Sequence, residues 1–181
     1  MSQNRVQIVI LCEDRQQEVF ARYFLEQRGF NSRFRAKINP PGSQSGEQYV
    51  RTEYAKEVQA YRQNKNRISL ALVVIIDADQ FTVEERLNQL ANTLKNNRQP
   101  DEAIAIFIPK RNIETWIHHL QGTLVDETTS YGKFVNNEAS CKGDIKQLVN
   151  QCYSQNLPNN VPPSLQKACE EFQRLLPLLK D

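Results

Sequence analysis

A chain of 181 residues with 39% hydrophobic residues is long enough for one domain with a substantial core, and its composition excludes a disordered protein. The net charge of +2 is too small to indicate a nucleic-acid binder by itself. The longest apolar run, Leu70 to Ile76, is too short to span a membrane, and the first residues lack a signal-peptide pattern. We therefore expect a cytoplasmic protein without membrane contact, with its four cysteines as reduced thiols.

The first part of the chain alternates strand-like and helix-like segments. Residues 6–12 form a short run of β-branched residues and leucine, which predicts a buried strand. Residues 16–28 have apolar positions at helical spacing and predict a helix. A second, more exposed strand is expected over 32–38, a turn-rich loop over 39–46 and a helix over 48–63.

The clearest strand lies in the middle of the chain. Residues 68–77 are almost continuously apolar, which is typical of a central strand buried on both faces of a parallel sheet. Thr82 and Glu85 have the spacing of a capping box, so a helix is predicted over 84–96. Residues 103–108 predict another buried strand.

The last third of the chain is more polar and contains no strand-like run. Helices are predicted over 113–120, 141–154 and 164–179. Because strands alternate with helices in the first part, we expect an α/β, Rossmann-like fold with a mainly parallel sheet flanked by helices. This α/β domain is expected to cover residues 1–122, and residues 123–181 are expected to form a small helical C-terminal appendage.

Carboxylates follow two of the predicted strands. Glu13 follows the first strand, and Asp77 and Asp79 end the longest apolar run. The carboxyl ends of parallel strands share one edge of a sheet, where ligands bind, and residues two apart in extended chain face the same side. Hard oxygen ligands suit Mg²⁺ or Mn²⁺, which can activate water for phosphoryl transfer. The alternatives are that the two aspartates form a turn and helix cap and that Glu13 starts a helix.

This arrangement of acids resembles the Toprim domain of topoisomerases, primases and nucleases. In that domain a strand ends in glutamate and a later hydrophobic strand ends in Asp-x-Asp, here Glu13, Asp77 and Asp79. The segment Ile108 to Trp116 (IPKRNIETW) is similar to one in small stand-alone Toprim-like proteins related to the OLD-family (overcoming lysogenization defect) nucleases. The resemblance covers residues 5–120. It implies a Toprim-like fold in which Glu13 is a metal ligand or acid/base and the two aspartates are metal ligands.

The chain departs from this family pattern on the predicted first helix. Gln17 stands where the OLD-type proteins have a further acid, and Glu18 lies about 100° further round a helix. Glu114 could supply the missing catalytic carboxylate, or it could be an acid favoured at a helix start. Lys110 and Arg111 could bind a scissile phosphate, or they could be ordinary surface residues.

A basic segment offers a second feature of interest. No acidic residue occurs between Glu26 and Glu47, and this stretch includes Arg33, Arg35 and Lys37. These side chains could contact the phosphates of a nucleic acid. They could equally protect the edge of the sheet from pairing with another chain.

The leading interpretation is a Mg²⁺-dependent (or Mn²⁺-dependent) nuclease of the Toprim class that hydrolyses phosphodiesters of DNA or RNA. The resemblance also implies a role in bacterial defence against phage, together with an AAA- or ABC-type ATPase as partner. Two alternatives stay open: a non-catalytic Toprim-like binding subunit, which Gln17 would suit, and another metal-dependent phosphotransferase. The sequence also leaves open whether the chain forms a homodimer.

Overall fold

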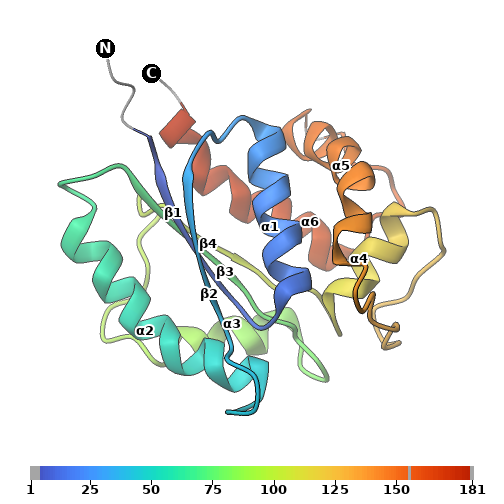
Figure 1. Ribbon diagram of the computed structural model, residues 1–181, viewed down its shortest axis with the longest axis horizontal. Coiled ribbons are helices and arrows are strands. Elements are labelled where there is room, and N and C mark those ends of the chain that lie inside the picture. Colours follow the sequence, from blue (N-terminus) through green and yellow to red (C-terminus); the bar gives the residue numbers. More distant parts are fainter. Residues whose placement is uncertain (1–4, 155, 180–181) are drawn as a thin grey trace.

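The computed structural model describes residues 5–154 and 156–179, and its centre is a parallel β-sheet (Figure 1). The sheet has four strands, all parallel, in the order β2-β1-β3-β4. The strands are β1 (Gln7–Cys12), β2 (Arg33–Ile38), β3 (Leu70–Ile75) and β4 (Ile104–Phe107). The expected α/β, Rossmann-like fold with a parallel sheet flanked by helices is therefore confirmed.

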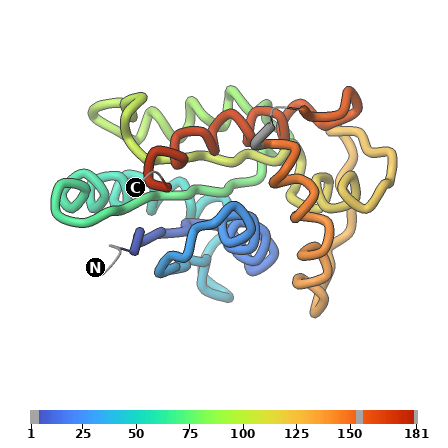
Figure 2. Tube along the Cα trace, turned by 90° about the horizontal axis from the view of Figure 1, so that it is seen from above, coloured from blue at the N-terminus to red at the C-terminus, as the bar shows by residue number. Residues whose placement is uncertain are grey.

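Helices cover both faces of the sheet. They are α1 (Arg15–Arg28), α2 (Gly46–Asn64), α3 (Val83–Ala91), α4 (Ile113–Leu120), α5 (Lys142–Ser154), α6 (Pro163–Phe172) and the short 3₁₀ helices η1 (Glu138–Cys141) and η2 (Gln173–Leu179). The helices α1, α5 and α6 lie on one side of the strands (Figure 1). Helix α2 lies on the other side, where it contacts α3. Viewed from above, α2 lies at one end of the molecule and α4 and α5 at the other (Figure 2). Within the described residues, no helix is both long enough and apolar enough to cross a membrane.

The connections diverge between β1 and β3. From β1 the chain passes through α1 to the edge strand β2, whereas from β3 it passes through α3 to the opposite edge strand β4. Neighbouring strands whose connections leave in opposite directions form a topological switch point, and ligands of open α/β sheets bind outside the carboxyl ends of such strands. Glu13 directly follows β1 and Asp77 lies just beyond β3, so both acids stand at this point.

Local signals account for most element ends. The predicted capping box is confirmed: Thr82 Oγ1 accepts from the backbone N–H of Glu85 at 3.0 Å, and Glu85 Oε2 accepts from that of Thr82 at 2.7 Å. The helix is shorter than predicted because it ends at Asn92, a weak helix former that is followed by threonine. The predicted helix over 164–179 is α-helical only to Phe172 and continues as 3₁₀ helix, which contains Pro177.

The C-terminal helices pack into the same hydrophobic core as the sheet. The ring of Phe24 on α1 lies 4.9 Å from that of Phe172 on α6 and 6.4 Å from that of Phe107 on β4. Trp116 on α4 is fully buried, and its Nε1 donates to Ser164 Oγ at 2.8 Å. The helices α5 and α6 therefore complete the cover of one face of the sheet.

The cysteines differ from the expectation of four reduced thiols. Cys152 on α5 and Cys169 on α6 form a disulfide, whereas Cys12 and Cys141 are free and buried. The expectation of reduced thiols is therefore wrong for Cys152 and Cys169. The two residues are 17 apart in sequence, and only the packing of α5 against α6 brings their Cα atoms to 5.2 Å.

Candidate functional site

Glu13 and Asp77 meet at the switch point, where the side-chain amide of Gln17 joins them. Gln17 Nε2 donates to Glu13 Oε2 at 3.0 Å and to Asp77 Oδ1 at 2.9 Å. Gln17 Oε1 accepts from the backbone N–H of Glu13 at 2.9 Å, and Glu13 Oε2 accepts from that of Asp77 at 2.5 Å. The predicted convergence of these two carboxylates is thus present, with an amide group between them.

Two local features hold this trio in place. Asp14 is the N-cap of α1 and accepts from the backbone N–H of Gln17 at 3.0 Å, which sets the first turn of the helix and points Gln17 inward. Gln17 is completely buried. On the other side, Gly46 at the start of α2 packs so closely on Glu13 that an added Cβ atom would lie 2.6 Å from Glu13 Cβ.

Asp79 follows Asp77 by two residues, but the chain is not extended here as the sequence interpretation assumed. The negative charge of Asp79 nevertheless contributes to the raised pKa of both Glu13 and Asp77. Its backbone is left-handed (φ 53°), because the chain turns here toward the loop after β4. The backbone N–H of Asp79 donates to the carbonyl of Arg111 at 3.0 Å, and that of Ala78 to the carbonyl of Pro109 at 2.9 Å. The Asp79 side chain is 51% exposed, and its Oδ2 pairs with Arg86 at 3.2 Å.

Arg86 on α3 organises this loop, and the sequence interpretation did not include it. Its guanidinium is only 1% exposed and donates to the carbonyl of Asp77 at 3.1 Å and to carboxylates of Asp79 and Glu47 at 3.2 and 3.1 Å. A further bond goes to Gln89 Oε1 at 2.7 Å. One signal in the sequence is that Arg86 lies one helical turn before Leu90, so that both residues stand on the same, buried face of the helix. An arginine on a buried face needs hydrogen-bond partners.

Glu114 is buried at the start of α4, on the Asp14 side of the site. It is 2% exposed and lines a cavity of about 210 Å³ together with Asp14, Lys133 and Glu138. No other described residue donates a hydrogen bond to its carboxylate. Its position next to the N-terminus of α1 makes it a neighbour of Glu13 and Asp77 rather than a member of the hydrogen-bonded trio.

The two predicted phosphate-binding cations follow β4. Lys110 Nζ donates to the carbonyl of Phe81 at 2.5 Å and so closes the loop between β3 and α3. Arg111 has a left-handed backbone (φ 68°), and its positive charge opposes the rise in the pKa of Asp79. Arg111 therefore lies close to Asp79, and Lys110 holds the neighbouring loop.

Burial and mutual repulsion raise the pKa values of these acids. Burial raises the pKa of Glu13 to about 7, against hydrogen bonds from Asp77 and Gln17 that lower it. The pKa of Asp77 is raised well above its usual value, first by burial and then by the negative charges of Glu13 and Glu114. Burial also raises the pKa of Glu114 and of Asp79. The charged forms of these acids are therefore disfavoured in the absence of a cation.

The donor set fits a hard divalent cation in part. Glu13 Oε1 and Asp77 Oδ2 accept no hydrogen bond from the described residues, so each acid keeps one oxygen for a ligand. In the described part of the chain, however, no three His, Cys, Asp or Glu side chains are arranged to hold a metal ion. The amide of Gln17 lies between the first two carboxylates, and Arg86 holds Asp79. A complete site would need Asp79 to leave Arg86.

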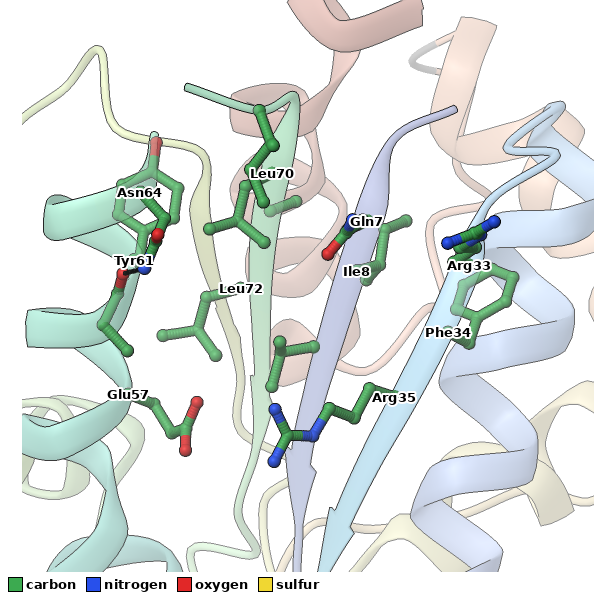
Figure 3. A pocket seen from close by; sticks show the side chains of 14 residues that line it. Gln7, Ile8, Arg33, Phe34, Arg35, Glu57, Tyr61, Asn64, Leu70 and Leu72 are labelled. Atoms are coloured by element: carbon green, nitrogen blue, oxygen red, sulfur yellow. Dashed lines mark hydrogen bonds between the residues drawn. The ribbon is translucent and has the colours of Figure 1, made fainter. Parts of the chain in front are cut away.

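Of the basic residues of β2, Lys37 pairs in register with Leu11, near the carboxyl end of β1, whereas Arg33 and Arg35 pair with Gln7 and Val9, further from the carboxylates. Lys37 forms an ion pair with Glu57 of α2. Arg33 and Arg35 line a separate cavity over the first half of the strands (Figure 3). The two arginines are therefore not part of the carboxylate site, and the charge of Lys37 is paired with Glu57.

No family model, curated protein or solved structure matches the chain significantly. Its function is therefore inferred from the residues of the site and their geometry.

Proposed function

We propose that the protein is a Mg²⁺- or Mn²⁺-dependent nuclease of the Toprim-like class, which hydrolyses phosphodiesters of DNA or RNA. The observation that carries the proposal is the meeting of Glu13 and Asp77 at the switch point of a parallel sheet, with one free oxygen each. A divalent cation would stabilise the charged forms of both acids, which burial and then the neighbouring carboxylates disfavour. The resemblance of the sequence adds phage defence with a separate AAA- or ABC-type ATPase to this proposal.

Each residue of the site has a chemical role in this proposal. Asp77 and Glu13 would hold the cation, which when bound supplies Lewis-acid activation of water and neutralises phosphate charge. If Asp77 alone holds the cation, Glu13, whose pKa is raised to about 7 in the cation-free site, would instead accept a proton from water. Glu114 is the next carboxylate within the same charge cluster. Arg111 would bind the scissile phosphate.

The test is cleavage of plasmid, single-stranded DNA and tRNA with Mg²⁺ or Mn²⁺. Asp77→Asn keeps the shape of the side chain and removes its charge, so we expect a loss of activity of about 100-fold or more. The matched control is Asp101→Asn, an exposed aspartate before β4 that should cleave like the wild type. Equal cleavage by the wild type and Asp77→Asn would refute the proposal, as would an inactive wild type on all three substrates.

A second candidate is a non-catalytic subunit that binds a partner or nucleic acid with this fold. The hydrogen bonds from Gln17 to Glu13 and Asp77 favour it, because an uncharged amide already partners the two oxygens that a bridging cation would use. Titration calorimetry with Mn²⁺ discriminates between the two. Absence of heat with the folded wild type would favour the binding subunit, and saturable binding that Asp77→Asn abolishes would favour the nuclease.

A further inference from the structure

A cavity of about 450 Å³ lies over the amino-terminal half of the sheet, between the strands and the last turns of α2 (Figure 3). Cavities of this size hold small organic ligands. Val9 in its lining precedes Glu13 by four residues, about 13 Å along a strand. A ligand bound here would therefore be separate from one at the carboxylates.

One wall of this cavity is positively charged. The parallel register pairs Arg33 with Gln7 and Arg35 with Val9, so both arginines stand on the face of the sheet that α2 covers in part. Both are exposed, and no ion pair joins either to an acid among residues 5–154 and 156–179. Arg35 extends from β2 toward the α2 side (Figure 3). Guanidinium groups in this position would bind a phosphate through charge-assisted hydrogen bonds.

The acid in the cavity does not cancel this charge. Among the described lining residues, Glu57 is the single carboxylate, and it is 8% exposed and paired with Lys37. Its negative charge is therefore neutralised by a residue outside the lining. The cavity selects an anion rather than a cation.

The floor and the far wall have a different chemistry. Val9, Leu70 and Leu72 give the floor an apolar surface, on which a flat ring can pack. The far wall carries the Tyr61 phenol and the Asn64 side chain, whose Nδ2 donates to the carbonyl of Ala60 and leaves its oxygen as an acceptor. The two ends of the cavity thus suit an anion and a hydrogen-bonding ring.

We propose that this cavity binds a free nucleoside monophosphate, with its phosphate on Arg33 and Arg35 and its base on the apolar floor toward Asn64. Inorganic phosphate would leave the floor uncovered, and an uncharged nucleoside would leave both arginines without an anion. The ligand site is independent of the nuclease proposal, because no carboxylate of the switch point takes part in it.

The test is titration calorimetry of the full chain with AMP, GMP, CMP and UMP, and with adenosine and phosphate as partial ligands. We expect at least one nucleotide to bind, and adenosine and phosphate to bind about tenfold or more weakly. Arg33→Gln and Arg35→Gln should each raise the Kd by a similar factor. Arg67→Gln removes the same charge from an exposed residue outside the cavity and should leave the Kd unchanged.

A steric variant tests the place of binding without changing charge. Ala60 is exposed on α2 and lines the cavity, so Ala60→Phe should abolish binding, whereas Gln59→Phe on the same helix lies outside the lining and should not. Asp77→Asn should bind the nucleotide normally, which separates this test from that of the nuclease. Failure of all four nucleotides to bind would overturn the proposal. Binding of only a single-stranded oligonucleotide, or binding unaffected by Ala60→Phe, would overturn it as well.

Discussion

Gly46 and Glu13 are packed so closely that residue 46 has no room for a side chain. A Cβ atom there would lie 2.6 Å from Cβ and 2.9 Å from Oε1 of Glu13. Gly46 is the first residue of α2 and Glu13 follows β1, so this contact sets the start of the helix against the switch point. Residue 46 is glycine because a Cβ atom at this position would overlap the side chain of Glu13.

Gly46→Ala should therefore lower the free energy of unfolding by about 1–3 kcal/mol, because either Glu13 or the start of α2 must shift. Urea denaturation measures the effect. Gly143→Ala is the matched control: Gly143 lies in α5 with no atom within 4 Å of an added Cβ. It should be neutral or stabilising by up to about 1 kcal/mol. Equal effects of the two substitutions would contradict the close contact.

Gln17→Glu places a third carboxylate between Glu13 and Asp77. Without metal it should lower the melting temperature, because an amide donor is replaced by a like charge in a buried position. With Mn²⁺ the loss should be recovered in part, since three carboxylates then face one cation. Thermal unfolding with and without Mn²⁺ measures both effects, and Gln27→Glu on the exposed side of α1 is the control. A melting temperature of Gln17→Glu that does not respond to Mn²⁺ would argue against a cation position here.

Arg86→Met should lower the free energy of unfolding by about 1–3 kcal/mol, because it removes the buried donor to Asp79 and Glu47, whose own side chains are partly exposed. It also removes the donor to the carbonyl of Asp77. Arg51→Met is the comparison, since Arg51 pairs with the same Glu47 but is 39% exposed, and its loss should cost less than about 1 kcal/mol. Chemical denaturation measures the free energy of unfolding of both variants. Equal losses would contradict a stabilising role for the buried guanidinium of Arg86.

Stability should fall as pH rises through the range in which Glu13 titrates. Its pKa is raised from 4.5 to about 7 on folding, so its contribution is fully present below pH 4.5 and is lost as pH rises through 7. The loss is no more than roughly 3 kcal/mol. His119, whose pKa burial lowers, acts in the opposite direction below its usual value of 6.5. Denaturation at pH 5 to 8 should give a flatter profile for Glu13→Gln than for the wild type, and identical profiles would contradict the raised pKa.

Reduction of the Cys152–Cys169 disulfide should lower the free energy of unfolding by about 3 kcal/mol, the value for a loop of this length. The bond joins α5 to α6, so the C-terminal helices should lose protection from proteolysis first. Thiol titration of the unfolded, non-reduced protein should give two free groups, from Cys12 and Cys141. Four free thiols, or no effect of reductant on stability, would contradict the pairing.

The parts of the fold that depend on local patterns were predictable from the sequence. β3 is buried on both faces from Ala71 to Ile75, and this requires the apolar run that the sequence displays there. The meeting of Glu13 and Asp77 followed from a topological rule, because both acids come just after neighbouring parallel strands. Neither prediction needed knowledge of side-chain packing.

The parts that depend on contacts distant in sequence were not predictable. The left-handed backbone of Asp79 accompanies a hydrogen bond from its N–H to Arg111, which lies 32 residues further along. Arg86 is buried because acceptors from α2 and from the loop after β3 surround it. The disulfide likewise required the packing of α5 on α6. Such partners are set by tertiary structure, on which local periodicity carries no information.

The hydrogen bonds from Ala78 to Pro109 and from Asp79 to Arg111 continue the pairing of β3 and β4 beyond both strands. The loops after β3 and β4 are therefore hydrogen-bonded to each other in register. An insertion in one loop would shift this register and break the hydrogen bonds between them. Among relatives of this protein, the lengths of these two loops should change together or not at all.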